Sequence, residues 1–558
     1  MNTRIIECVP NFSEGLDAHI IQQIAKSIED VAEVKLLNID PGKDTNRTVI
    51  TFAGDPESVS EAAFRAVKKA QELIDMTKHH GTHPRMGATD VLPLIPIQGI
   101  TLEETAEIAQ LLGKRIGEEL QIPIYLYEAS AKDPRRKNLA YCRSGEYEGL
   151  EKKLSNPEQK PDYGPCEFDD SVAKSGATAV GARDFLIAVN FNLNTTSTRR
   201  ANAIAFDVRE KGRPMREGNS LTGKICKDNE GNTIMIPGSL KGTKAIGWYI
   251  DEYKMAQVSM NITDINTTPL HVAFEEVRQK AEARGVRVTG TEIVGLVPKS
   301  VIVDAGKYYL ERQHRSLGIS EEEIIRVAEQ SLGLNQLNSW DAKSRIIEYL
   351  IDDNKDNRLL DLSLRDFLNV TASESPAPGG GSASAYIGAI GIALGTMVAN
   401  LSAHKRGWDQ QWDIFSSYAQ KGQIIMQRLS SLVDEDTNAF NKVMECFSMP
   451  KSTDKDRTEY LKALEEANTY AAKVPLITMK ACLEAIPILE SMLEIGNQNS
   501  RSDILVGLLA VQAGCEGAYQ NVRINTDELQ NIDVAEKIIE EAKSIRNQMN
   551  SHIKALYK

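Results

Sequence analysis

The sequence predicts an α/β region made of two β-α-β-β-α-β-like subdomains, followed by an all-α helical bundle. Strand and helix signals alternate over the first third of the chain, and a similar order returns near residue 182. Strand signals vanish from Phe367 onward. Because the 558 residues exceed what one hydrophobic core normally serves, we expect several domains.

The first subdomain is predicted to cover residues 1–181. Thr101 and Glu104 have the spacing of a capping box and should open its third helix. The alternation indicates helices packed on a sheet. We expect strands at 4–9, 34–39, 47–53, 91–95 and 124–127, and helices at 18–31, 57–76 and 102–120.

The second subdomain, residues 182–332, repeats this order, and Asn190-Phe191 matches Asn11-Phe12 at the end of the first strand. Two such layers facing one another would leave a cleft for a small molecule. Residues 212–238 form an extra segment, in which 228–232 should make a hairpin turn. We expect strands at 185–193, 244–250, 257–263 and 286–297, and helices at 198–210 and 270–284.

A polar linker is predicted at 333–366, and a helical module at 367–558. Pro475 and Pro487 should divide its third helix, because proline removes a backbone donor. The helices are expected at 383–403, 414–447, 457–493, 502–519 and 533–556.

The stretch Ala385–Ala403 carries no charge and could be mistaken for a membrane span. Its small and polar residues favour a buried helix in a bundle instead. Gly388, Gly391 and Gly395 suit close helix contact, so we also expect this module to form homo-oligomers.

Composition indicates a cytoplasmic protein that binds neither nucleic acid nor membrane. The net charge of -13 argues against neutralising a phosphate backbone. The seven cysteines are scattered without a CxxC spacing, which fits reduced thiols better than disulfides or zinc. The N-terminus shows no apolar segment of the kind a secretory signal requires.

The run from Lys78 to Asp90 gathers three of the eight histidines and is punctuated by glycine and proline. Imidazole titrates near neutrality, so the cluster suggests proton transfer. His83 precedes Pro84, which holds the backbone extended in a loop. The same histidines could instead cap a helix end or bind a metal, and the residues alone leave these readings open.

The segment Glu7-Cys8-Val9-Pro10-Asn11-Phe12-Ser13-Glu14-Gly15, together with His83-Pro84-Arg85-Met86-Gly87, resembles the formiminotransferase family. The resemblance implies that His83 is a general acid/base and that tetrahydrofolate is the co-substrate, with no metal. Asp40 could orient the imidazole or merely cap a turn. The resemblance also assigns folate contacts to one loop: Gly164, Pro165, Cys166, Glu167, Phe168, Asp169, Asp170, Ser171, Val172, Ala173, Lys174, Ser175 and Gly176.

Asp436 is predicted to lie on an apolar helix stripe with Leu432, Phe440, Val443 and Phe447. A buried carboxylate is costly unless it is partnered or useful. It could therefore form an ion pair with an arginine such as Arg501, or it could be catalytic.

The segment Pro376-Ala377-Pro378-Gly379-Gly380-Gly381-Ser382 and the run from Gly496 to Asp503 resemble the cyclodeaminase and methenyltetrahydrofolate cyclohydrolase family. The resemblance implies that Asp436 is the deaminase acid/base, with Arg501 and Asp503 as support. It assigns a site loop to Gly379, Gly380, Gly381 and Ser382.

Together the resemblances imply a bifunctional folate enzyme of histidine degradation. The first module would move the formimino group from N-formimino-L-glutamate to tetrahydrofolate, and the second would cyclise the product to 5,10-methenyltetrahydrofolate with release of ammonia. The alternatives are formyl transfer with methenyltetrahydrofolate cyclohydrolase activity, or a C-terminal module that serves mainly in oligomerisation.

Overall fold

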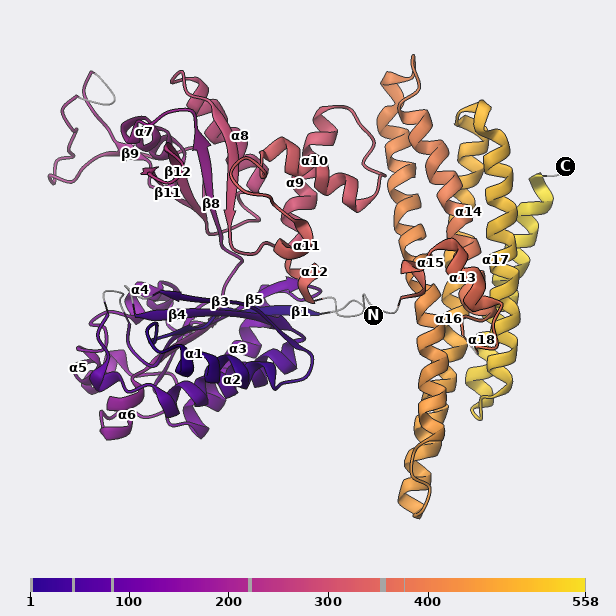
Figure 1. Cartoon of the computed structure of the whole chain (residues 1–558), viewed down its shortest axis with the longest axis horizontal. Helices are drawn as coiled ribbons and strands as arrows, with labels where there is room; N and C mark the ends of the chain where they lie inside the picture. The colour runs from indigo at the N-terminus through magenta and orange to yellow at the C-terminus, as the bar shows by residue number, and fades with distance from the viewer. Residues whose placement is uncertain are drawn as a thin grey trace. The chain divides into compact units, whose positions relative to one another are not determined.

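The computed structural model describes residues 4–42, 46–81, 85–218, 223–351, 358–375 and 377–556. The chain divides into two compact units (Figure 1). Unit 1 comprises residues 1–305 and 332–352 and contains the sheets. Unit 2 comprises residues 306–331 and 353–558 and is helical. An α/β region followed by a helical region is the coarse fold that the sequence predicts.

The first sheet of unit 1 has seven strands. β1 and β2 both lie between β4 and β5 in antiparallel pairing, β3 pairs with β4, and β5, β7 and β6 follow in parallel. The strands are β1 (Ile5–Cys8), β2 (Asn11–Phe12), β3 (Val34–Gly42), β4 (Arg47–Gly54), β5 (Thr89–Gln98), β6 (Ile124–Glu128) and β7 (Thr178–Ala182).

Three helices cover one face of this sheet: α1 (Ala18–Glu29), α2 (Pro56–Leu73) and α3 (Leu102–Glu119) (Figure 1). Each begins at a residue whose side chain accepts backbone N–H groups. The capping box of α3 is confirmed, because Thr101 N donates to Glu104 at 2.8 Å and Glu104 N donates to Thr101 Oγ1 at 3.2 Å. On the central strand β5, Leu92 and Leu94 face the helices and Val91 packs on the other side.

Shorter helices complete the first part of the chain. They are α4 (Leu139–Cys142), α5 (Leu150–Ser155) and α6 (Asp170–Ser175), with 3-10 turns at Met76–Lys78, Pro134–Lys137 and Pro157–Gln159.

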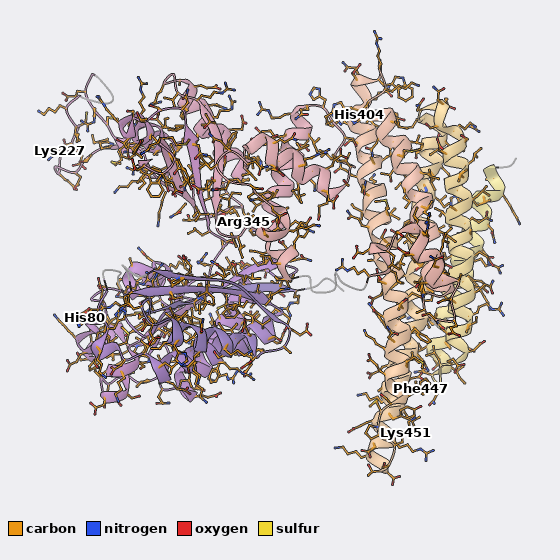
Figure 2. The ribbon with its side chains drawn as sticks, viewed as in Figure 1. His80, Lys227, Arg345, His404, Phe447 and Lys451 are labelled. Atoms are coloured by element: carbon orange, nitrogen blue, oxygen red, sulfur yellow. The ribbon has the colours of Figure 1, made fainter. Side chains whose placement is uncertain are left out.

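The second sheet is antiparallel, in the order β11, β12, β8, β13. Along the chain its elements run β8 (Ile187–Leu193), α7 (Thr198–Val208), β11 (Thr243–Ile250), β12 (Met255–Ile262), α8 (Leu270–Glu282) and β13 (Val288–Val294). The extra segment pairs β9 (Arg213–Pro214) with β10 (Met235–Ile236). Its tip, near Lys227, turns where Asp228 N donates to the Asn232 carbonyl at 2.9 Å (Figure 2).

The region predicted as a linker is partly packed. Ile346 and Ile347 are fully buried, and α12 (Ile347–Ile351) contacts β3 and β4, so unit 1 continues past residue 332. The remaining helices between the second sheet and the long helices of unit 2 are α9 (Lys299–Arg312), α10 (Glu321–Leu332), α11 (Ala342–Arg345) and α13 (Leu364–Thr371), with a 3-10 turn at Leu359–Asp361.

Unit 2 is built from five long helices around one apolar core. They are α14 (Gly380–Ala403), α15 (Trp412–Phe447), α16 (Asp454–Ile495), α17 (Arg501–Asp527) and α18 (Ile532–Leu556), with 3-10 turns at Asp409–Gln411 and Gln498–Ser500. The segment after α9 also packs here, since Leu317 N donates to Ser416 Oγ at 3.0 Å.

The prediction that prolines divide the third helix is wrong, because α16 runs unbroken through Pro475 and Pro487. Pro475 cannot donate to the carbonyl of Ala471 four residues earlier. Asn525 of α17 donates its Nδ2–H to that carbonyl instead, at 2.7 Å. Pro475 and Pro487 lie in a helix with many buried residues, so packing holds the helix together across both.

Among the described residues, α14 alone is long and apolar enough to cross a membrane, and 61% of its apolar window is buried within the protein. A core helix of a bundle meets the same criteria. Its glycines face other helices of the same chain: a Cβ at Gly391 would lie 2.7 Å from the Gly507 carbonyl oxygen, and one at Gly388 would lie 2.8 Å from Cys482 Sγ. They therefore serve packing inside unit 2 and no longer argue for oligomerisation.

Candidate functional sites

The two motifs of the first module lie against each other in the fold. Ser13 N donates to the Ala88 carbonyl at 2.9 Å, and Ser13 Oγ donates to the Gly87 carbonyl at 2.8 Å. Asn46 connects them a second time: its Oδ1 accepts from Gly15 N, and its Nδ2 donates to the His80 carbonyl, both at 2.9 Å. The fold thus assembles one loop site from segments distant in sequence.

His83 lies outside the described residues, so its contacts and role stay predictions. The neighbouring His79 is buried, and its Nε2 lies 2.9 Å from the Asn46 carbonyl oxygen. Because a carbonyl only accepts, His79 carries its hydrogen on Nε2, and Nδ1 accepts from Arg85 Nε at 3.3 Å. His79 therefore holds the loop in place.

Two ion pairs lie beside this loop, each with one buried partner, and sequence reasoning did not single them out. Arg85 donates to both carboxylate oxygens of Glu148, at 2.9 and 2.7 Å. Asp90, which is 1% exposed, accepts from Arg143 at 2.5 Å and from Met86 N at 3.1 Å. The only sequence feature that pointed to these ion pairs is that Arg85 and Asp90 belong to the histidine-rich run. Bidentate and buried pairs of this kind fix backbone geometry.

Asp40 is exposed on β3 and pairs with Val49 in the sheet register. Burial lowers the pKa of Arg47, and the negative charges of Asp90 and Asp40 offset part of that lowering. Because His83 is not described, an orienting role for Asp40 stays a prediction.

The predicted folate loop reaches the histidine motif at its far end. Ala88 N donates to the Ser175 carbonyl, and Ala177 N donates to the Met86 carbonyl, both at 2.8 Å. A Cβ on Gly87 would lie 2.3 Å from the Ala177 carbonyl oxygen, so this approach requires glycine.

Within that loop, Asp169 accepts from Val172 N and opens α6. Tyr147 contacts the ring of Phe168 and donates its hydroxyl to the Ala173 carbonyl at 2.5 Å. Several loop side chains remain exposed and available to a ligand: Cys166, Glu167, Asp169, Asp170, Ser171 and Lys174. Whether they bind folate stays a prediction.

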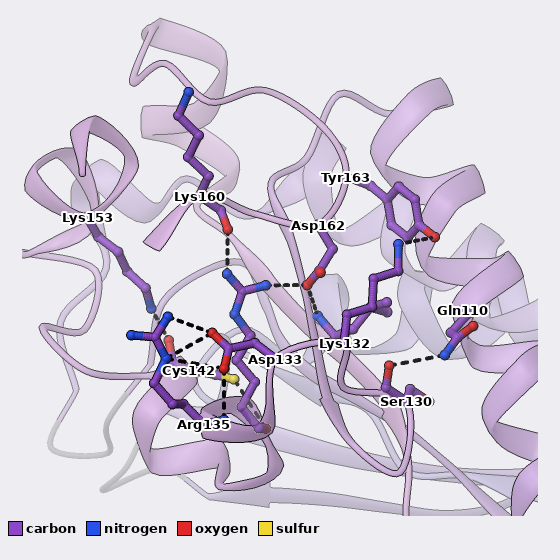
Figure 3. Close-up of polar contacts among 12 residues, drawn as sticks. Gln110, Ser130, Lys132, Asp133, Arg135, Cys142, Lys153, Lys160, Asp162 and Tyr163 are labelled. Atoms are coloured by element: carbon purple, nitrogen blue, oxygen red, sulfur yellow. Dashed lines mark hydrogen bonds and ion pairs between the residues drawn. The ribbon is translucent and has the colours of Figure 1, made fainter. Parts of the chain in front are cut away.

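A polar cluster fixes the chain where the loop begins (Figure 3). Arg136 donates to Asp162 and to the Lys160 carbonyl, both at 2.5 Å, and Leu126 N donates to Asp162 at 2.8 Å. The nearby Lys153 is buried and donates to the Cys142 carbonyl, and burial lowers its pKa to about 8. The loop therefore starts from a rigid base.

In the helical unit, Asp436 of α15 meets the start of α14. Asp436 Oδ2 accepts from Ser382 N at 2.8 Å and from Ser382 Oγ at 3.1 Å. Gly379 at the helix start has no side chain to cap the free N–H groups, so the carboxylate of another helix does so. The arrangement brings the glycine-rich loop and Asp436 together.

Burial raises the pKa of Asp436, and the hydrogen bonds from Ser382 offset only part of that rise. A Cβ on Gly381 would lie 2.0 Å from Asp436 Oδ1, so the close approach depends on glycine there. The stripe prediction is wrong in part: Phe440 and Phe447 are 37% and 52% exposed. α14 begins beside Asp436, so the turns of α15 that follow Asp436 do not pack against α14. Phe447, which Figure 2 labels, lies at the C-terminal end of α15.

A cavity of about 320 Å³ opens beside Asp436. Its wall comes from the start of α14 and from the three following helices. It is lined by Ala377, Gly379, Gly380, Gly381, Asp436, Thr437, Ala439, Phe440, Val443, Asn468, Ala471, Asn521, Asn525 and Glu528. The three asparagines and Glu528 were not predicted, because residues on separate helices leave no local motif.

Arg501 and Asp503 do not join this site within one chain. Asn497 N donates to Ser402 Oγ at 2.9 Å, so α17 begins beside the C-terminal end of α14, where Figure 2 labels His404. The 24 residues of α14 span about 36 Å between that end and Asp436. An ion pair between Asp436 and Arg501 in one chain is therefore ruled out.

Across the described parts of the chain, no group of three or more His, Cys, Asp or Glu side chains is placed to hold a metal ion. The seven cysteines are all free, and most are buried.

Family models match nearly the whole chain. The model described as the formiminotransferase domain, N-terminal subdomain, matches residues 5–183, and the formiminotransferase domain matches 188–352. The model described as formiminotransferase-cyclodeaminase matches 363–544.

Curated relatives agree with these matches. A formimidoyltransferase-cyclodeaminase of Dictyostelium discoideum is 41% identical over 97% of this chain and 96% of its own. A glutamate formimidoyltransferase of Streptococcus pyogenes is 41% identical over 55% of this chain and 94% of its own. A methenyltetrahydrofolate cyclohydrolase of Methylorubrum extorquens is 33% identical over 33% of this chain and 88% of its own.

The α/β module and the helical module with its separate cavity define a two-module enzyme of folate one-carbon metabolism. The chain belongs to the formimidoyltransferase-cyclodeaminase family.

Proposed function

We propose that the first module transfers the formimino group from N-formimino-L-glutamate to N5 of tetrahydrofolate, and that the second cyclises the product to 5,10-methenyltetrahydrofolate and releases ammonia. The observation that carries the second half is Asp436, a partly buried carboxyl of raised pKa on the wall of a cavity. Family membership over the full length supports both halves.

For the transfer, N5 attacks the amidine carbon and must lose its proton. His83 takes that proton and gives it to the departing nitrogen of glutamate, so one imidazole serves both steps. The loop from Gly164 to Gly176 supplies the folate contacts in this proposal, which its approach to Met86 and Gly87 supports.

For the cyclisation, N10 attacks the carbon of the protonated formimino group on N5. The Asp436 carboxylate takes the N10 proton and passes it to the amino group of the tetrahedral intermediate. Ammonia then leaves as its bond to carbon breaks, and the positive charge stays on the methenyl product. A raised pKa suits a group that must hold the proton between the two transfers.

A second candidate for the helical module is hydrolysis of the methenyl group, which its likeness to a methenyltetrahydrofolate cyclohydrolase favours. A direct assay separates the candidates. Purified protein receives formiminoglutamate and tetrahydrofolate, while methenyl absorbance and ammonia are followed separately. We expect methenyltetrahydrofolate and ammonia to form in equal amounts. The cyclohydrolase would be favoured if the protein opened supplied methenyltetrahydrofolate but released no ammonia from the formimino compound.

We further propose that the enzyme works in the cytoplasm as a homo-oligomer. The free cysteines support a reducing compartment. Apolar side chains exposed along α14 support association of helical units: Ile387, Ile390, Met397 and Leu401. Light scattering of the purified chain would test this, and a monomer with full turnover of both reactions would contradict it.

A further inference from the structure

Three asparagines from two helices line the same cavity as the carboxyl of Asp436: Asn468 of α16, and Asn521 and Asn525 of α17. A Cβ placed on Gly380 would lie 3.4 Å from the amide of Asn521, and one placed on the next residue, Gly381, would touch Asp436. The amide and the carboxyl therefore flank two successive residues of one helix start and can reach the same small group.

Each amide donates its N–H to a backbone carbonyl. Asn521 Nδ2 donates to the Gly517 carbonyl at 2.9 Å, and Asn468 Nδ2 donates to the Glu528 carbonyl at 3.4 Å. Asn525 Nδ2 donates to the Ala471 carbonyl, which Pro475 leaves without its helical donor. Because a carbonyl only accepts, these bonds decide which end of each amide is nitrogen.

The other end of each amide is therefore an oxygen that can only accept. Within the described residues, no donor of the protein bonds Oδ1 of Asn521 or Asn525. Asp436 and Glu528 add carboxylate oxygens, and no described lining residue carries a positive charge. Such a wall favours a small ligand group that donates N–H bonds or is cationic, and disfavours one that presents an oxygen.

We propose that Asn521 and Asn525 accept hydrogen bonds from the formimino nitrogen and so select the formimino group over a formyl group. This inference rests on the proposed deaminase function. The protonated formimino group ends in an NH₂ with two donors, and it donates throughout its conversion to ammonia. A formyl group ends in an oxygen, which would face the amide oxygens and leave all of them unpaired.

The acceptor can be removed without unfolding the helices. Asn521→Leu keeps the size of the side chain and removes the oxygen. Asn525→Leu also leaves the Ala471 carbonyl unpaired, so it is combined with Pro475→Ala, which restores the helical N–H. Gln520→Leu is the matched control, because Gln520 is the exposed neighbour of Asn521 on the same helix and does not line the cavity.

Two quantities are measured for each variant: kcat/KM for ammonia release from 5-formiminotetrahydrofolate, and the inhibition constant of 5-formyltetrahydrofolate. We expect kcat/KM to fall about 10- to 100-fold, with inhibition by the formyl compound unchanged or stronger, while Gln520→Leu behaves as wild type. Equal weakening of both compounds would mean that the amides contact the shared pterin ring, and it would overturn the proposal.

An unchanged kcat/KM in both variants would overturn it as well. Wild-type protein that releases no ammonia from 5-formiminotetrahydrofolate would instead refute the deaminase function itself, so the two failures are distinguishable.

Discussion

Asn525 of α17 takes the place of the backbone N–H that Pro475 removes from α16. Its Nδ2 donates to the Ala471 carbonyl at 2.7 Å, on the wall of the cavity beside Asp436. One side chain thus replaces the backbone hydrogen bond that Pro475 removes, and the same bond fixes the orientation of its amide. The bond connects the folding of α16 with the chemistry of the site.

This relationship predicts a rescue. Asn525→Leu should lower the free energy of unfolding by about 1–2 kcal/mol, because the Ala471 carbonyl loses its donor. Pro475→Ala in the same chain should recover most of that loss by restoring the helical N–H. Urea unfolding followed by circular dichroism, analysed as a double-mutant cycle, checks it. Additive effects of the two substitutions would show that they do not share the carbonyl.

The second prediction compares adjacent glycines. Gly381→Ala places a Cβ 2.0 Å from Asp436 Oδ1, whereas Gly380→Ala meets only the Asn521 amide at 3.4 Å, an ordinary contact. The carboxylate can move aside, so we expect Gly381→Ala to keep its thermal stability within about 1 kcal/mol but to lose about 10- to 100-fold in ammonia release. Gly380→Ala should stay within about threefold of wild type. Equal activity of the two variants would argue against a role for the Asp436 position.

The third prediction is that the two activities separate by mutation. His83→Ala should abolish glutamate release from formiminoglutamate while leaving cyclisation of supplied 5-formiminotetrahydrofolate intact, because His83 and Asp436 lie in different units. Both reactions are measured on one preparation. Loss of both in a folded variant would contradict separate sites.

The fourth prediction concerns pH and Glu7, which is 2% exposed on β1 and whose pKa burial raises from 4.5 to about 7. The folded chain therefore binds this proton more tightly than the unfolded chain does, and stability from this group is lost as pH rises from about 4.5 through about 7. Glu7→Gln should remove that loss and stabilise the protein at pH 8 by about 1–3 kcal/mol.

Thermal unfolding of wild type and Glu7→Gln at pH 5 and pH 8 provides the measurement. We expect the gap between the two proteins to widen at pH 8. A gap that is the same at both pH values would show that Glu7 does not titrate in this range.

Local patterns predicted much of the fold, and they predicted that the glycine-rich segment and Asp436 belong to one candidate site. The capping box of α3 and the turn at 228–232 follow from adjacent residues, so both could be predicted. The unbroken α16 could not, because the donor that replaces the N–H of Pro475 comes from another helix. The asparagines of the cavity lack a motif for the same reason, because they lie on separate helices. The glycines of α14 predict close helix packing, but they do not show whether the partner helix belongs to the same chain or to another copy.

Asp436→Asn tests the central claim most directly, since amide and carboxyl are nearly isosteric but only the carboxyl exchanges protons. Ammonia release from 5-formiminotetrahydrofolate is measured from pH 4 to 8, beside glutamate release on the same preparation. We expect the wild-type rate to rise with pH through a pKa above the usual 3.8 of aspartate. The variant should lose about 100-fold or more in ammonia release and keep its transferase activity. A folded variant with unchanged ammonia release would contradict the assignment and leave Asp436 as the cap of α14.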